Sequence, residues 1–175
     1  IRPYAINADT WWGHGFDGGD PWVPAILDTG VRTAHQALDH VDEWDSQICL
    51  TAAGNPAQDN TSSDVNGHGT HMAGIVVSDY YDYPTLYRGL ARDTAEALNL
   101  KAAYDLDNND GGPAIMYWSD MMDCADWALT HPGGGTPHAD VFNLGYTDCV
   151  TKTQEDSPAA RFWDAVVDDQ LVPAA

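Results

Sequence analysis

Basic residues are scarce in this sequence. Seven Lys and Arg stand against 27 Asp and Glu, which gives a formal net charge of -20 over 175 residues. Only two lysines occur, Lys101 and Lys152, and 24 of the acidic residues are Asp. A field of this sign repels polyanions, so the composition argues against nucleic acid and anionic membranes as partners.

The acidic residues are spread along the chain and are not collected in a tail, which indicates a solvated acidic surface. We hypothesise that the protein is adapted to high salt (halophilic), because dense carboxylates hold water and counterions. A stability that rises or stays flat between low and molar NaCl would support this hypothesis. Full stability in salt-free buffer would contradict it.

Long apolar runs are also missing. No stretch reaches the roughly 18 apolar residues that mark a transmembrane helix, so no membrane span is expected. There is no signal-peptide pattern either, and the first residue is Ile1 instead of Met, which suggests processing or trimming. With 43% hydrophobic residues in 175, the chain is long and apolar enough for one globular domain with a buried core.

Cysteines are few and odd in number: Cys49, Cys124 and Cys149. At most one internal disulfide can form, and the sequence does not determine its pairing. Free buried thiols are the alternative.

The clearest signal lies between Asp64 and Val76, where His68 stands between two glycines ahead of an apolar helix pattern. The glycines remove side chains beside the imidazole, so the backbone can turn sharply and leave one ring face open. Asn66 is expected to be the N-cap, which places His68 in the first turn of a helix that runs to about Ser78. The positive end of a helix disfavours a charged imidazolium, and a general base at neutral pH must be uncharged.

Two other interpretations of His68 remain open. It could be a buried structural histidine at a helix start. It could also share a metal with His71, three residues further along, although no Glu stands between them and no third ligand is evident.

A second candidate is Asp28, at the end of an apolar run from Trp22 to Leu27. Such a run is typical of a buried parallel strand, and sites in open α/β sheets lie at the carboxyl ends of strands. A simple turn or helix cap is the alternative role for Asp28. Pro24 counts against a central strand, because proline cannot donate to the ladder.

Both stretches carry a family resemblance. The string Asn-Gly-His-Gly-Thr-His-Xaa-Ala-Gly at residues 66–74 resembles the histidine motif of the subtilisin-like serine peptidases, and residues 25–31 resemble the aspartate motif of the same family. The two stand in the family's order and 40 residues apart. The resemblance implies an α/β fold in three layers, with a mostly parallel sheet flanked by helices, and a secreted, extracellular serine endopeptidase. Asp28 would orient the imidazole and His68 would act as the general base.

The resemblance also implies how a polypeptide substrate binds. The polar segment at residues 105–113, with Gly111 and Gly112, would form one wall of the peptide groove, although a simple linker is an equal alternative. The end of the strand at residues 139–146 would form the other wall through Leu144, Gly145 and Tyr146. Gly145 stands where the family usually has Ser. Recognition through main-chain pairing tolerates such changes.

No cofactor is expected to be required, and calcium is considered only as a structural ion. Asp79 and Asp82 follow the histidine helix, where many members of the family place a calcium loop. However, Ala37 stands where that family often supplies another Asp.

The nucleophile of such a peptidase is not found. The family's serine opens a later helix within Gly-Thr-Ser-Xaa-Ala, and none of the six serines lies in such a string. We therefore expect residues 1–175 to be the N-terminal part of one peptidase domain, partnered by a C-terminal remainder that carries the serine, and inactive alone. Two alternatives remain: a catalytically inactive peptide-binding or structural module with a degenerate peptidase fold, and a metal-dependent hydrolase that uses His68 and His71.

The other expected elements complete an α/β pattern. Helices are predicted at residues 6–12, 114–130 and 157–169, and strands at residues 48–50, 97–103 and 171–175.

Overall fold

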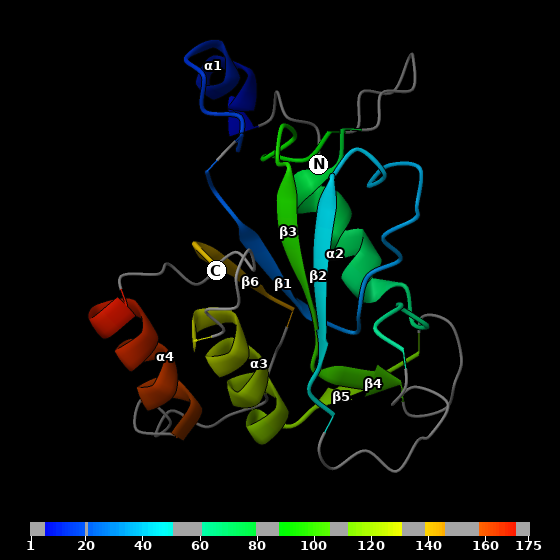
Figure 1. Ribbon diagram of the computed structural model, residues 1–175, viewed down its shortest axis with the longest axis vertical. Coiled ribbons are helices and arrows are strands. Elements are labelled where there is room, and N and C mark those ends of the chain that lie inside the picture. Colours follow the sequence, from blue (N-terminus) through cyan, green and yellow to red (C-terminus); the bar gives the residue numbers. More distant parts are fainter. Residues whose placement is uncertain are drawn as a thin grey trace.

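A computed structural model describes residues 6–19, 21–50, 61–79, 88–105, 112–130, 139–145 and 158–170. Its centre is a four-stranded, fully parallel sheet in the order β2-β3-β1-β6 (Figure 1). The strands are β1 (Pro24–Asp28), β2 (Glu43–Ile48), β3 (Glu96–Lys101) and β6 (Val141–Leu144). A short antiparallel hairpin, β4 (Ala103–Asp105) with β5 (Ala114–Met116), follows the carboxyl end of β3.

Helices cover both faces of this sheet. The described helices are α1 (Ala8–Gly13), α2 (His68–Val77), α3 (Trp118–Thr130) and α4 (Pro158–Gln170). Helix α2 lies on one face, where Ala73 and Val77 pack with Ile26 of β1, and α3 and α4 lie on the other (Figure 1). The predicted α/β architecture, a mostly parallel sheet flanked by helices, is confirmed.

Strand β1 is buried along its whole length because helices cover both of its faces. Ala25 and Leu27 belong to the core cluster under α3, while Ile26 belongs to the cluster under α2. Each large apolar side chain buried in this way contributes roughly 1.5–3 kcal/mol. Pro24 is compatible with a central strand, because it is the first residue of β1, where a missing N–H is tolerated.

The boundaries of three elements differ most from the prediction. Strand β2 spans Glu43–Ile48, earlier than the predicted 48–50, and it is polar and partly exposed because it has one neighbour among the described strands. The predicted strand 97–103 ends at Lys101. The predicted helix 114–130 begins only at Trp118, because residues 114–116 pair with β4 as β5. Such pairing depends on a distant partner and leaves no local pattern. The predicted strand 171–175 lies outside the described residues.

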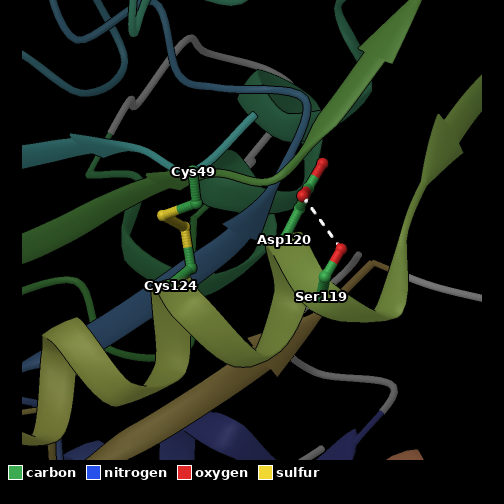
Figure 2. The surroundings of a disulfide bond; sticks show 4 residues. All are labelled: Cys49, Ser119, Asp120 and Cys124. Carbon is green, nitrogen blue, oxygen red and sulfur yellow. Dashed lines mark hydrogen bonds between the residues drawn. A yellow bond between two sulfur atoms is a disulfide. The ribbon is translucent and has the colours of Figure 1, made fainter. Parts of the chain in front are cut away.

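Cys49 and Cys124 form a disulfide across 75 residues (Figure 2). The bond joins the residue after β2 to the second turn of α3, within the core cluster on the α3 face. This resolves the alternatives that the sequence left open. Cys149 lies outside the described residues.

Candidate active site

Asp28 and His68 meet at the carboxyl end of the central strand. Asp28 is the last residue of β1 and is 1% exposed, and His68 is the first residue of α2. His68 Nδ1 lies 2.8 Å from Asp28 Oδ1 and 3.0 Å from Oδ2. The His68 side chain is 49% exposed, so one end of the ring is held by a buried carboxylate while the rest of the ring faces solvent.

The environment of Asp28 has two opposing effects on the pKa of its carboxyl. Burial raises the pKa of the Asp28 carboxyl above its ordinary value of 3.8, and hydrogen bonds from His68 and from the Thr29 N–H oppose that rise. The Thr29 N–H donates to Asp28 Oδ1 at 2.7 Å. The ionised form of Asp28 therefore depends on donors that the site itself provides.

Glycines let the backbones at this site come into contact. A Cβ at Gly69 would overlap the carbonyl oxygen of Gly30 and lie 3.1 Å from the Asp28 Cβ. Gly30 itself has φ 101°, and a Cβ there would overlap the carbonyl oxygen of Ser62. The start of α2 thus packs directly on the turn after β1, and this contact brings His68 to Asp28.

Gly145 lies against the Asp28–His68 pair. A Cβ at Gly145 would overlap Asp28 Oδ2 and lie 3.2 Å from His68 Cε1. The Gly145 N–H donates to the Leu27 carbonyl at 3.3 Å, which continues the β1–β6 pairing up to the site. The residue predicted to contact substrate is therefore also one that confines the carboxylate.

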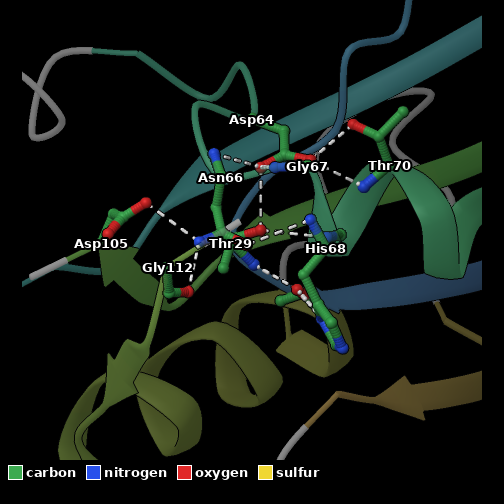
Figure 3. A network of polar contacts seen from close by, with 10 residues as sticks. Thr29, Asp64, Asn66, Gly67, His68, Thr70, Asp105 and Gly112 are labelled. Carbon is green, nitrogen blue, oxygen red and sulfur yellow. Dashed lines mark hydrogen bonds and ion pairs between the residues drawn. The ribbon is translucent and has the colours of Figure 1, made fainter. Parts of the chain in front are cut away.

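A buried carboxylate, Asp64, fixes the entry to α2, and the sequence reasoning had given it no role. Its Oδ1 accepts hydrogen bonds from Thr29 Oγ1 and from the N–H groups of Asn66 and Gly67 at 2.8–3.0 Å (Figure 3). Its Oδ2 accepts from the N–H and the hydroxyl of Thr70 at 2.9 and 2.6 Å. The signal was present in the sequence, because an Asp shortly before a glycine and a helix start is typical of a side chain that binds the following N–H groups.

The prediction that Asn66 is the N-cap is wrong. The N-cap is Gly67, with φ 101°, because only a residue without a Cβ adopts this backbone easily. Asn66 still serves the helix start, since its Oδ1 accepts from the His68 N–H at 3.2 Å. Its Nδ2 donates to Asp105 Oδ2 at 3.0 Å and to the Gly112 carbonyl at 2.9 Å (Figure 3). Asn66 therefore connects the histidine to the β4–β5 hairpin.

A cleft of about 810 Å³ opens between His68 and this hairpin. It is lined by Asp28, His68, Gly112, Gly145 and, from the hairpin, Ala103, Ala114, Ile115 and Met116, among others. Of the residues predicted to bind substrate, Gly112 and Gly145 lie here. Leu144 instead packs against the core cluster on the α3 face, while Gly111 and Tyr146 lie outside the described residues.

Of the two calcium candidates, only Asp79 lies among the described residues. Asp79 Oδ1 lies 3.4 Å from Arg88 Nε in an ion pair, and Asp82 lies outside the described residues. Within the part of the chain that the structure describes, no group of three or more His, Cys, Asp or Glu could hold a metal. His68 and His71 accordingly have no third ligand there.

Comparison with known proteins identifies the family. A family model described as the subtilase family matches residues 21–172. The chain belongs to the subtilase family. Subtilisin-like protease 3 of Saccharomyces cerevisiae is 39% identical to the chain over 69 residues, which are 39% of this chain and 11% of that relative. The chain thus matches only a small part of the relative's length.

Membership in the subtilase family confirms the resemblance seen in the sequence. Among the described residues, no helix combines the length and the apolar character needed to cross a bilayer.

Proposed function

We propose that this subtilase chain supplies the aspartate and the histidine of an Asp-His-Ser triad in a serine endopeptidase. The observation that carries the proposal is the contact of 2.8 Å between His68 Nδ1 and Asp28 Oδ1 at the carboxyl end of the central strand. In an open α/β sheet this is where catalytic groups gather.

The roles follow from the two ends of the imidazole. With Nδ1–H donated to Asp28, the neutral ring presents Nε2 as the acceptor, so Nε2 takes the proton of an attacking hydroxyl. His68 then returns this proton to the leaving amine. Asp28 keeps the ring in this tautomer and stabilises the imidazolium that forms in between.

The cleft beside His68 would hold the substrate as an extended chain. Gly112 on the hairpin side and Gly145 on the β6 side leave room for another backbone to approach, and main-chain pairing would supply most of the affinity. Ala103, Ile115 and Met116 give the hairpin side an apolar lining. Gly111 and Tyr146 stay predicted parts of these walls.

The nucleophilic serine would come from a C-terminal remainder of the same domain, and this chain alone would be inactive. The second candidate is an inactive peptide-binding module, because the cleft beside His68 could hold a peptide without a nucleophile. We further propose that the protein is secreted. The Cys49–Cys124 disulfide supports this, since such bonds persist in oxidising compartments. Calcium remains at most a structural ion.

The test is peptide hydrolysis by the complete protein together with labelling by a fluorophosphonate. We expect His68→Ala to lower kcat by about 10⁴-fold or more and to abolish labelling, because the base that activates the serine is lost. His35→Ala is the matched control, since His35 is an exposed histidine outside the cleft that contains Asp28 and His68, called the dyad below. Peptide binding without turnover or labelling in the wild type would favour the inactive module. Activity that is lost with chelator and with His71→Ala, but resists the fluorophosphonate, would point to a metal-dependent hydrolase.

A further inference from the structure

Lys101 is among the largest fully buried side chains in the described part of the molecule. It is the last residue of β3, it is 0% exposed, and it lies in register beside Asp28 of β1. Burying an ammonium group is costly unless the surroundings compensate it. A buried lysine is thus a poor way to stabilise a core, and its contacts indicate what else it does.

Lys101 and Asn99 hold two consecutive carbonyl groups of the segment that leads into α2. Lys101 Nζ donates to the Ser63 carbonyl at 3.1 Å, and Asn99 Nδ2 donates to the Ser62 carbonyl at 3.1 Å. The Ser62 carbonyl also accepts from the Val31 N–H at 3.3 Å. Residues 61–67, called the lead-in segment below, are therefore fixed to β3 and to the turn after β1.

The lead-in segment in turn fixes the dyad. It contains Asp64, which accepts from Thr29 Oγ1 and from Thr70 at the start of α2. It also contains Asn66, which accepts from the His68 N–H. Thr29, the residue after Asp28, reaches α2 directly, since its Oγ1 accepts from the Gly69 N–H at 3.0 Å. A shift of the Ser63 carbonyl would move Asp64 next, and Asp64 sets the position of both halves of the dyad.

We propose that Lys101 is a positioning residue for the proposed peptidase: its buried ammonium holds the lead-in segment so that Asp64 and Asn66 keep His68 in line with Asp28. The proposal rests on the proposed function, but its geometric content can be tested without catalysis. A methionine at this position would fill much of the space and leave the Ser63 carbonyl without this donor. The segment would then keep the hydrogen bond from Asn99 to Ser62 but lose the one from Lys101.

The experiment compares Lys101→Met with Leu98→Ala in the complete protein. Leu98 lies on β3 as well, is 0% exposed, and belongs to the core cluster on the opposite face of the sheet. We expect Lys101→Met to lower kcat by about 10²-fold with little change in KM, because a displacement of about 1 Å in a catalytic group has that effect. Leu98→Ala should lower the melting temperature and leave kcat per folded molecule unchanged.

Two readouts do not depend on turnover. In Lys101→Met we expect the downfield proton resonance of His68 Nδ1–H to shift or broaden, and the amides of Asn66, Gly67 and Thr70 to exchange faster with solvent while those of α3 do not. Leu98→Ala should change none of these. If the wild type hydrolyses no peptide, the proposed function fails, yet these two readouts still decide the role of Lys101.

Lys101→Gln covers the case in which Lys101→Met does not fold, because glutamine keeps a donor on a long side chain and should give smaller changes in the same direction. An unchanged resonance, unchanged exchange and unchanged kcat in a folded variant would overturn the proposal. If neither variant folds, Lys101 is a determinant of folding and the proposal is also overturned.

Discussion

Gly145 shows how little room the dyad leaves for a side chain. The Cβ of any other residue at this position would overlap Asp28 Oδ2. The carboxylate occupies the space that a Cβ would need, so residue 145 and the position of Asp28 are coupled.

We predict that Gly145→Ala lowers kcat by about 10²-fold, because Asp28 must move away from His68. Overpacking should also lower the free energy of unfolding by about 1–3 kcal/mol. Gly74→Ala is the matched control: it lies within α2, a Cβ there would meet nothing within 4 Å, and helix propensity should raise stability by about 0.5–1 kcal/mol. Peptide kinetics and urea unfolding measure both effects. A fully active Gly145→Ala enzyme would show that Asp28 can accommodate the added methyl group and still contact His68.

The raised pKa of Asp28 predicts a conflict between stability and function. The folded state retains the Asp28 proton to a higher pH than the unfolded chain, whose pKa is near the ordinary 3.8. Between pH 3.8 and the folded pKa, the unfolded state binds fewer protons than the folded state. The contribution of Asp28 to stability therefore falls as pH rises through this range. Above the folded pKa the full loss of stability is reached, because the buried carboxyl of Asp28 must then be ionised in the folded state.

Asp28→Asn should therefore be at least as stable as the wild type at neutral pH, with an advantage that shrinks as pH falls toward 3.8. Its turnover should fall by about 10⁴-fold, because the amide no longer favours the working tautomer of His68. Urea unfolding over a series of pH values measures the first effect and peptide kinetics the second. A variant that is less stable at neutral pH and recovers on acidification would mean that the folded pKa is lowered instead.

Among the elements, β1 and α2 could be predicted from sequence and β2 and β5 could not. Helices cover both faces of β1, so its continuous apolar run predicts a strand, and the glycines around His68 mark a helix start. Strand β2 is polar, and β5 is defined by pairing with β4. Such features depend on neighbours in space, and sequence periodicity does not report these neighbours.

The same limit applied within the site. The two motif residues Asp28 and His68 could be named from their surroundings in sequence. The hydrogen bond from Thr29 to Asp64, the position of Lys101 and the pairing of Cys49 with Cys124 could be seen only in the structure. Each of these residues works through a partner more than 30 positions away.

The disulfide gives a prediction for α3 and the hairpin before it. The bond closes a loop across 75 residues and ties down α3, which begins two residues after β5 in the cleft wall. Replacing Cys49 and Cys124 together by Ser should lower the free energy of unfolding by about 2–4 kcal/mol, chiefly because the unfolded chain gains freedom. Thermal melts with and without reducing agent measure this effect. Cys149→Ser leaves this bond intact and is the control, and an equal effect in both variants would contradict the prediction.

For the whole molecule, a net charge of -20 means that like charges repel across the surface. Screening shortens the reach of that repulsion from about 30 Å at 0.01 M salt to about 3 Å at 1 M. We predict that the melting temperature rises between salt-free buffer and molar NaCl, with most of the gain at low concentrations if screening alone is responsible. A gain that continues into the molar range would support adaptation to high salt, and full stability in salt-free buffer would contradict that adaptation.

The strand order also sets when the dyad can form during synthesis. Strand β1 leaves the ribosome early, but its two neighbours, β3 and β6, follow only at residues 96–101 and 141–144. Until then Asp28 lies at the end of a strand with open edges, and Gly145 is not there to confine it. Asp28 and His68 are therefore synthesised long before the strands that position Asp28. The pair can take up its contact only after the ribosome has translated most of this chain.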